Sequence, residues 1–183
     1  MKNFAELTFR LFQGESDYPL IQSIYNQSMQ ADQIDDAALL EDIKSWYAPS
    51  PRFDPWQDIL FAMWQEDGGE PRTVGFSRTR WYTGLAGARL YVQSSFLLPE
   101  GRQRGLWPAI VTRNDVRLQE IAASHPGISE RYYQGWATSK QVDWIDALKS
   151  QGYQAVRHFN NMLHHLDAIP ERPMPAGLEV RLV

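Results

Sequence analysis

The chain has 183 residues, of which 43% are hydrophobic and 22% charged, so it is long enough for one folded domain and short for two. Its net charge of −4 argues against a general binder of nucleic acid or anionic membranes, because either partner requires a basic surface. The absence of cysteine excludes disulfides, thiol nucleophiles and thiolate metal sites. No apolar run approaches the roughly 20 residues that span a bilayer, and the first residues lack a signal-peptide core, so we expect a soluble cytoplasmic protein.

The first half of the chain predicts a strand, two helices and a hairpin. Alternation with period two indicates strands, and apolar residues three or four apart indicate helices. A Gly-Gly turn between two alternating runs is typical of a hairpin. The predicted elements are the strand Leu7–Leu11, the helices Tyr18–Met29 and Asp36–Trp46, a proline-rich loop from Pro49 to Pro55, and the strands Asp58–Gln65 and Thr73–Arg80.

The second half adds a long strand, two helices and three short strands. They are the strand Arg89–Leu98, the helix Trp107–Ala123, the strand Tyr132–Ala137, the helix Lys140–Ser150, and a closing pair Tyr153–Phe159 and Asn161–Leu166. The order βααβββαβαββ predicts an α+β fold, with a mixed, mostly antiparallel twisted sheet and helices on both faces. Three prolines in Ile169–Pro175 predict a linker, so we expect one domain over residues 1–167 and a linker with a strand over 168–183.

The most informative feature is a glycine-bearing loop between the predicted strand Arg89–Leu98 and the long helix that begins at Trp107. It reads Leu97-Leu98-Pro99-Glu100-Gly101-Arg102-Gln103-Arg104-Gly105-Leu106-Trp107-Pro108. A strand that passes through such a loop into a helix directs unpaired backbone N–H groups and the positive end of the helix dipole at one point. That arrangement suits a phosphate or pyrophosphate group. The two arginines would attract an anion, and Gly105 would allow its close approach to the backbone.

This order of elements, with a Pro-x-x-Arg-x-x-Gly turn, resembles the GNAT acyltransferase family from about Leu7 to Leu166. The family pattern Gln/Arg-x-x-Gly-x-Gly/Ala reads here Arg102-Gln103-Arg104-Gly105-Leu106-Trp107, and the helix end Leu148–Tyr153 is also typical. The resemblance implies acetyl-CoA as co-substrate, no metal, and direct attack of an amine on the thioester. The residues that it implies for coenzyme binding are Leu97, Leu98, Arg102, Gln103, Arg104, Gly105, Leu106, Trp107 and Gln141.

Several positions depart from the family pattern. Trp107 stands where the family keeps Gly or Ala, and it could stack on a ligand, plug the site or pack into the core. Pro108 follows and has no N–H to donate. Leu148 occupies the place of a tyrosine general acid, and Gln141 that of a coenzyme-contacting asparagine. On the preceding strand, Gln93, Ser94 and Ser95 replace the usual carboxylate. The catalytic residues therefore stay unassigned.

The remaining aromatic and histidine residues predict no second chemistry. His164 and His165 are adjacent on a predicted strand, so their side chains face opposite ways and cannot share a metal. We interpret His158 as a sheet-surface residue. The pairs Trp81-Tyr82 and Tyr132-Tyr133 are placed to line either an acceptor pocket or a domain interface.

A faint repeat suggests a second copy of the domain. Leu178–Leu182 repeats the Leu, Arg and Leu of Leu7–Leu11, after a proline-rich linker and Gly177. This arrangement resembles tandem, mycothiol-synthase-like proteins of the GNAT family, and it implies that the chain is the N-terminal half of such a protein. A chance match or an extra edge strand remain the alternatives.

Two main functions follow from the sequence. The first is an acyl-CoA-dependent N-acyltransferase that passes an acetyl group to an unidentified small-molecule amine or peptide N-terminus. The alternative is a catalytically silent domain that binds acyl-CoA or supports an active partner, and a sensor of this fold would bind without turnover. Expected partners are the amine and a second GNAT domain or a homodimer, with no nucleic acid and no membrane.

Overall fold

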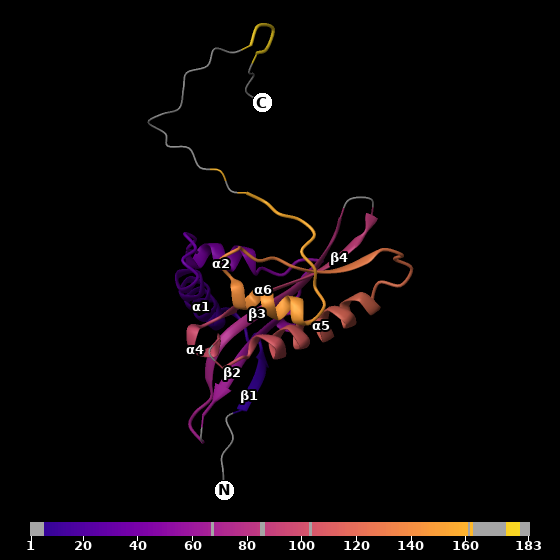
Figure 1. Cartoon of the computed structure of the whole chain (residues 1–183). Helices are drawn as coiled ribbons and strands as arrows, with labels where there is room; N and C mark the ends of the chain where they lie inside the picture. Colours follow the sequence, from indigo (N-terminus) through magenta and orange to yellow (C-terminus); the bar gives the residue numbers. More distant parts are fainter. Residues whose placement is uncertain are drawn as a thin grey trace.

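The structure is a computed structural model, and it describes residues 6–66, 68–84, 87–102, 104–160, 162 and 175–179. In this part of the chain five strands form one sheet in the order β1-β2-β3-β4-β5 (Figure 1). The first three neighbouring pairs are antiparallel and β4 pairs with β5 in parallel, so the predicted α+β class with a mixed sheet is confirmed. The strands are β1 (Glu6–Leu11), β2 (Ile59–Gln65), β3 (Arg72–Thr83), β4 (Arg89–Leu97) and β5 (Arg131–Gly135).

Helices cover both faces of this sheet. They are α1 (Tyr18–Ala31), α2 (Leu40–Trp46), α3 (Pro55–Asp58), α4 (Pro99–Arg102), α5 (Trp107–Ala123) and α6 (Val142–Ser150), with a 3-10 turn at Glu15–Asp17. On one face Ile21 of α1 and Ile43 of α2 are buried in a cluster with Phe76 of β3. On the other face Val111 of α5 and Trp144 of α6 share a second cluster with Leu97. No described helix is long and apolar enough to cross a membrane.

Helix α2 begins four residues later than its apolar spacing predicts. The segment before it lies extended against α1, where the side-chain amide of Asn26 bonds both backbone groups of Ala38. Asp36 accepts a hydrogen bond from the Tyr25 hydroxyl at 2.7 Å, which also holds the segment in place. Because these bonds satisfy the backbone outside a helix, the start at Asp36 was wrong and the helix begins at Leu40.

The closing strand pair is not found in the described residues. Tyr153–Phe159 alternates in sequence but forms no strand, and Val156 is 88% exposed. Its expected partner, Asn161–Leu166, lies outside the described residues except for Met162. Alternation shows which side chains could share a face, whereas a strand also requires hydrogen bonds to a neighbour. The predicted linker and strand over 168–183 is likewise described only at 175–179.

Candidate functional site

The parallel strands β4 and β5 separate halfway along β4. Their pairing runs from Arg89 opposite Arg131 to Gln93 opposite Gly135. Strand β4 then continues through Ser94–Leu97 beside β3 alone, so one edge of this stretch has no strand partner among the described residues. An open strand edge offers backbone N–H and C=O groups to an extended ligand. Leu97 and Leu98 lie at its end with buried side chains. The Leu98 N–H donates to the Val74 carbonyl, and the carbonyls of Leu97 and Leu98 accept hydrogen bonds from Arg102, so these groups are not free for a ligand.

The loop after β4 folds back on itself before α5 begins. One turn of helix, α4, is followed by Gly105 in a left-handed conformation with φ of +67°, where a side chain would be strained. The N–H groups of Arg102, Arg104 and Gly105 are each bonded to carbonyl groups within the loop, at 3.0 to 3.2 Å. These N–H groups are therefore already used, and the free donors lie one step further along the chain.

The first turn of α5 provides those free donors. Ile110 makes the first bond of the helix ladder, its N–H donating to the carbonyl of Leu106 at 3.2 Å. The preceding N–H groups of Leu106, Trp107 and Ala109 therefore have no partner within the helix, and Pro108 has no N–H. Three donors and the positive end of a 17-residue helix face the loop, which is a favourable place for an anion.

Arg102 is engaged inside the protein. Its guanidinium pairs with Asp32 and donates to the Leu97 carbonyl at 2.7 Å and to the Ser28 hydroxyl at 3.1 Å. The exposed fractions are 16% for the Arg102 side chain and 6% for that of Asp32, so the pair is buried. Arg102 thereby ties the end of β4 to α1, and its predicted contact with phosphate stays a prediction.

Arg104 has a more exposed partner. Its guanidinium pairs with Glu66 at the end of β2 and donates to the Glu100 carbonyl. The hydrogen bond from Arg104 lowers the pKa of the Glu66 carboxyl, although half of that side chain is exposed. An exposed pair of this kind adds little stability, so an anionic ligand can compete with Glu66 for the guanidinium. Gln103, the residue between the two arginines, lies outside the described residues.

Trp107 and Gln141 meet at a small pocket between the starts of α5 and α6. The pocket measures about 80 Å³, well below the roughly 300 to 1,000 Å³ of most ligand pockets, and Arg102 also lines it. The Trp107 ring is 5% exposed and lies 5.1 Å from that of Trp144, so the indole packs into the core. Its Nε1 is buried and has no hydrogen-bond partner. Gln141 accepts a hydrogen bond from the Thr138 N–H at 2.9 Å.

A buried polar network that the sequence did not reveal lies beneath the point where the strands separate. The Gln93 amide donates to Asp115 of α5 at 2.8 Å and to the Tyr153 hydroxyl at 2.7 Å. That hydroxyl donates to Asp115 at 2.6 Å. Burial and the neighbouring carboxylate raise the pKa of Tyr153, so it stays protonated at neutral pH. Burial also raises the pKa of Asp115, against the hydrogen bonds from Tyr153 and Gln93.

Removing the Tyr153 hydroxyl is expected to destabilise the fold. Tyr153→Phe leaves Asp115 and the Gln93 amide with one fewer partner in a half-buried setting, which costs about 1 to 3 kcal/mol in the free energy of unfolding. Urea denaturation would measure the loss. Tyr132→Phe is the matched control, because Tyr132 is 55% exposed and should tolerate the same change. Equal stability of both variants would contradict a role for this network.

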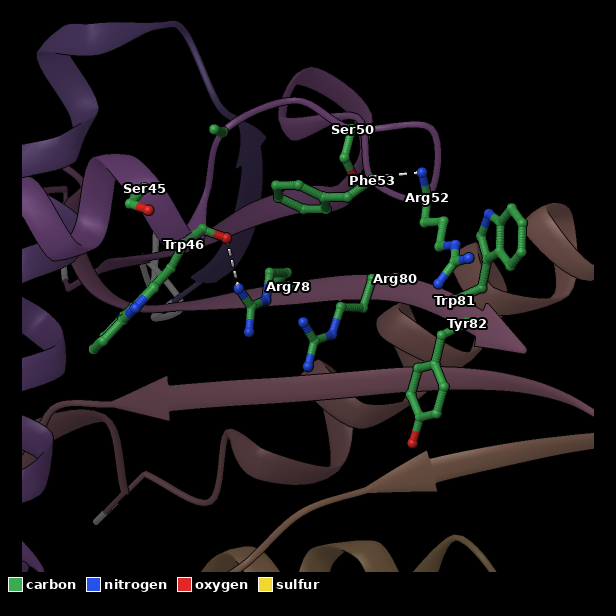
Figure 2. Close-up of a pocket in the computed structure, with 10 residues that line it drawn as sticks. Ser45, Trp46, Ser50, Arg52, Phe53, Arg78, Arg80, Trp81 and Tyr82 are labelled. Atoms are coloured by element: carbon green, nitrogen blue, oxygen red, sulfur yellow. Dashed lines mark hydrogen bonds between the residues drawn. The ribbon is translucent and has the colours of Figure 1, made fainter. Parts of the chain in front are cut away.

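A second and larger pocket lies on the opposite face of the sheet, between α2, the loop that follows it and β3. Its volume is about 410 Å³, and Arg52, Arg78 and Arg80 line it together with Trp46 (Figure 2). The predicted aromatic pair Trp81 and Tyr82 belongs to this pocket as well. The other pair, Tyr132 and Tyr133, lies exposed on β5.

No group of three or more His, Asp or Glu side chains that could hold a metal occurs in the described part of the chain. His158 is exposed on a segment without a strand, whereas His164 and His165 lie outside the described residues. Leu148, at the expected place of a tyrosine acid, is buried against β5. A Cβ atom on Gly135 would come within 2.9 Å of the Leu148 side chain.

Comparisons with known proteins identify the fold. No protein-family model and no curated protein match the chain. A GCN5-related N-acetyltransferase from Sphaerobacter thermophilus is similar with a TM-score of 0.65 and 17% identity, over 82% of this chain and 44% of its own. A predicted acetyltransferase from Clostridium acetobutylicum, solved with acetyl-CoA, has a TM-score of 0.58 and 13% identity, over 87% of this chain and 99% of its own.

An aminoglycoside N-acetyltransferase solved in complex with CoA is also similar. It has a TM-score of 0.52 and 10% identity, over 88% of this chain and 97% of its own. At such identities the likeness establishes a shared fold. The chain spans less than half the length of the Sphaerobacter protein.

Proposed function

We propose that this chain, which has the fold of the GCN5-related N-acetyltransferases, binds acetyl-CoA and transfers its acetyl group to a small amine. One observation carries the proposal: the open edge of β4 at Ser94–Leu97 leads directly to the free N–H groups at the start of α5. A strand edge suits the amide-bearing arm of the coenzyme, and a helix start suits its pyrophosphate. The solved relatives with bound CoA or acetyl-CoA support this assignment.

The described residues fit the coenzyme in part. Leu106, Trp107 and Ala109 would donate their N–H groups to the pyrophosphate, and Arg104 would exchange Glu66 for it. The indole Nε1 of Trp107 lies at the same helix start but is buried, so we do not count it among these donors. Arg102 would act indirectly, because its pair with Asp32 fixes the loop from which these donors project.

In this proposal the transfer depends on the orientation of the amine and the thioester more than on an acid or base side chain. A C–N bond forms as the amine attacks the thioester carbonyl, the C–S bond breaks, and the proton that the amine loses ends on the coenzyme sulfur. Holding both reactants at the separation of β4 and β5 lowers the barrier through proximity. We assign no proton transfer to Tyr153, because its hydroxyl is engaged with Asp115 and the Gln93 amide. No described side chain is assigned as the base, so we propose that solvent water carries the proton.

A catalytically silent domain is the second candidate, and two observations favour it. Leu148 fills the place of the expected acid against Gly135, and the Trp107 ring occupies the core beside the loop. Release of free thiol from acetyl-CoA in the presence of a panel of amines separates the two candidates. Binding of acetyl-CoA without thiol release from any amine would establish the silent domain or a sensor.

A charge placed at the start of α5 is expected to weaken coenzyme binding without harming the fold. Ala109 is exposed in the first turn, where an acidic residue favours the helix. Ala109→Asp should raise the Kd for acetyl-CoA about tenfold, since a repulsion of roughly 1.4 kcal/mol has that effect. Calorimetric titration would measure it, with Ala109→Asn as the neutral control of equal size. Equal Kd values for the two variants, or no binding by the unaltered chain at millimolar acetyl-CoA, would contradict the proposal.

The tandem arrangement is part of the same proposal. The partial coverage of the Sphaerobacter protein and the repeat of Leu7–Leu11 at Leu178–Leu182 both support a second domain after the linker. A coding sequence that continues past Val183 with a second region of this pattern would agree with it, and a stop codon there would overturn it. A homodimer would be the other way to supply a second domain. From the composition alone, we propose that the chain is cytoplasmic.

A further inference from the structure

Three arginines gather in the 410 Å³ pocket on the α2 face of the sheet. Arg78 and Arg80 lie beside each other along β3, and Arg52 reaches from the loop after α2 toward Trp81 (Figure 2). The Arg78 guanidinium donates to the Trp46 carbonyl at 3.1 Å and lies 4.5 Å from the centre of the Tyr47 ring. The volume falls within the range of pockets that bind small molecules.

The positive charge in this pocket is not balanced. Among the residues that the structure describes, no carboxylate forms an ion pair with Arg52, Arg78 or Arg80. Asp54, next to the loop, instead caps α3 by accepting from the Trp56 N–H at 3.1 Å. The Nε of Arg78 is buried and has no partner. Partial desolvation within the pocket and the charge of Arg78 lower the pKa of Arg80, although the side chain is largely exposed.

The three arginines gather here although the chain as a whole has a net charge of −4. Like charges held together without a counter-ion cost free energy, and an incoming anion recovers it. Guanidinium groups bind carboxylates and phosphates through paired N–H donors. Trp46, which is 46% exposed, supplies a flat surface that favours an apolar or aromatic body next to the anion.

The pocket lies beside the proposed reaction centre. Arg78 is opposite Ser94 in the β3–β4 register, and Ser94 is the first residue of β4 beyond its pairing with β5. Residues opposite each other share a face of a sheet, so Ser94 and the arginines face α2. Since neighbouring strands lie about 4.8 Å apart, roughly 10 Å separate the β3 and β5 backbones. Helices α5 and α6 cover the other face, from which the coenzyme would approach.

We infer that the acceptor is an amine that carries an oxyanion, a carboxylate or a phosphate, several bonds away from its nitrogen. The inference rests on the proposed acetyl transfer for its amine, and on the arginine pocket for its anion. Arg52, Arg78 and Arg80 hold the oxyanion, Trp46 flanks the spacer, and the nitrogen reaches the separated strands near Ser94. An amine and a carboxylate on the same carbon atom are too close together to reach both places.

Calorimetric titration with para-(aminomethyl)benzoate and its neutral amide tests this inference. Both probes carry an amine on the same rigid aromatic spacer and differ only in the anion. The benzoate is expected to bind at least tenfold more tightly than the amide, and Arg80→Gln or Arg52→Gln should abolish most of the difference. Both side chains are exposed and make no side-chain hydrogen bond within the described residues, so the variants should fold. The corresponding phenyl phosphate shows whether phosphate or carboxylate is preferred.

Arg113→Gln is the matched control, because Arg113 is exposed on α5, away from the pocket, and its loss removes the same charge. This variant should retain the full preference for the benzoate. Equal binding of benzoate and amide, or a preference that survives in both pocket variants, would overturn the inference. If only the proposed acetyl transfer is wrong, the result is distinguishable: the chain would still prefer the benzoate to the amide, but acetyl-CoA would not bind or would not release free thiol.

Discussion

Arg102→Met is expected to lower the free energy of unfolding by about 3 to 5 kcal/mol, because it leaves the Asp32 carboxylate buried without its partner. The substitution also removes hydrogen bonds to the Leu97 carbonyl and the Ser28 hydroxyl. These contacts join α1 to the end of β4, immediately before the candidate coenzyme loop. Urea denaturation would measure the effect: the midpoint concentration should fall, while the slope of the unfolding free energy against urea concentration stays constant.

The double variant Asp32→Leu, Arg102→Met provides the control. Replacing both members of a buried ion pair by apolar residues is often nearly neutral, so the double variant should be more stable than Arg102→Met alone. If the two substitutions instead add their separate losses, the ion pair is not the reason for the instability. Together with Asp32→Leu alone, the cycle thus shows how much of the lost stability comes from the ion pair.

Trp107→Ala should cost about 3 to 5 kcal/mol, as expected for the loss of a large buried aromatic side chain. Trp107→Phe should cost only about 1 to 2 kcal/mol. The phenyl ring can still pack against Trp144, and the indole N–H has no partner whose hydrogen bond would be lost. Thermal and urea unfolding of the two variants would provide the comparison.

Coenzyme titration of Trp107→Phe adds a functional readout. A packing role predicts an unchanged Kd for acetyl-CoA in this variant. A phenylalanine variant as unstable as the alanine one, or with a Kd raised tenfold, would show that the indole nitrogen itself has a polar role. Either result would contradict the assignment of Trp107 to the core.

The long elements could be predicted because their burial follows their periodicity. Helix α5 has the predicted bounds, and its apolar positions Ile110, Val111 and Leu118 are all buried. The start of α2 could not be predicted, because the bonds between Asn26 and Ala38 come from another helix. Helices α3 and α4 have four residues each, which is too short for a periodic signal.

The backbone geometry of the candidate loop could be predicted, whereas the partners of its side chains could not. The positive φ of Gly105 and the start of α5 at Trp107 follow from local sequence, since a glycine before a helix indicates such a turn. The partner of Arg102 is 70 positions away in the sequence, and that of Tyr153 is 38 away. Only the packing of α1 and α5 against the sheet brings those groups together.

The arginine pocket shows the same limit. Arg78 and Arg80 are two apart on a strand, so their shared face could be read from the sequence. The loop after α2 brings Arg52 to the other two arginines, which the sequence does not show. Nor does the sequence show that, within the described residues, no carboxylate pairs with any of the three.

The central claim is that acetyl-CoA binds where β4 leaves β5 and α5 begins. Backbone and indole N–H resonances of the isotope-labelled chain, recorded during a titration with acetyl-CoA, test it most directly. We expect the shifts to concentrate at Ser94–Leu97 and Gly105–Ala109, with the Trp107 indole among them and β1 unaffected. No shifts up to millimolar acetyl-CoA, or shifts confined to the arginine pocket on the α2 face, would contradict it.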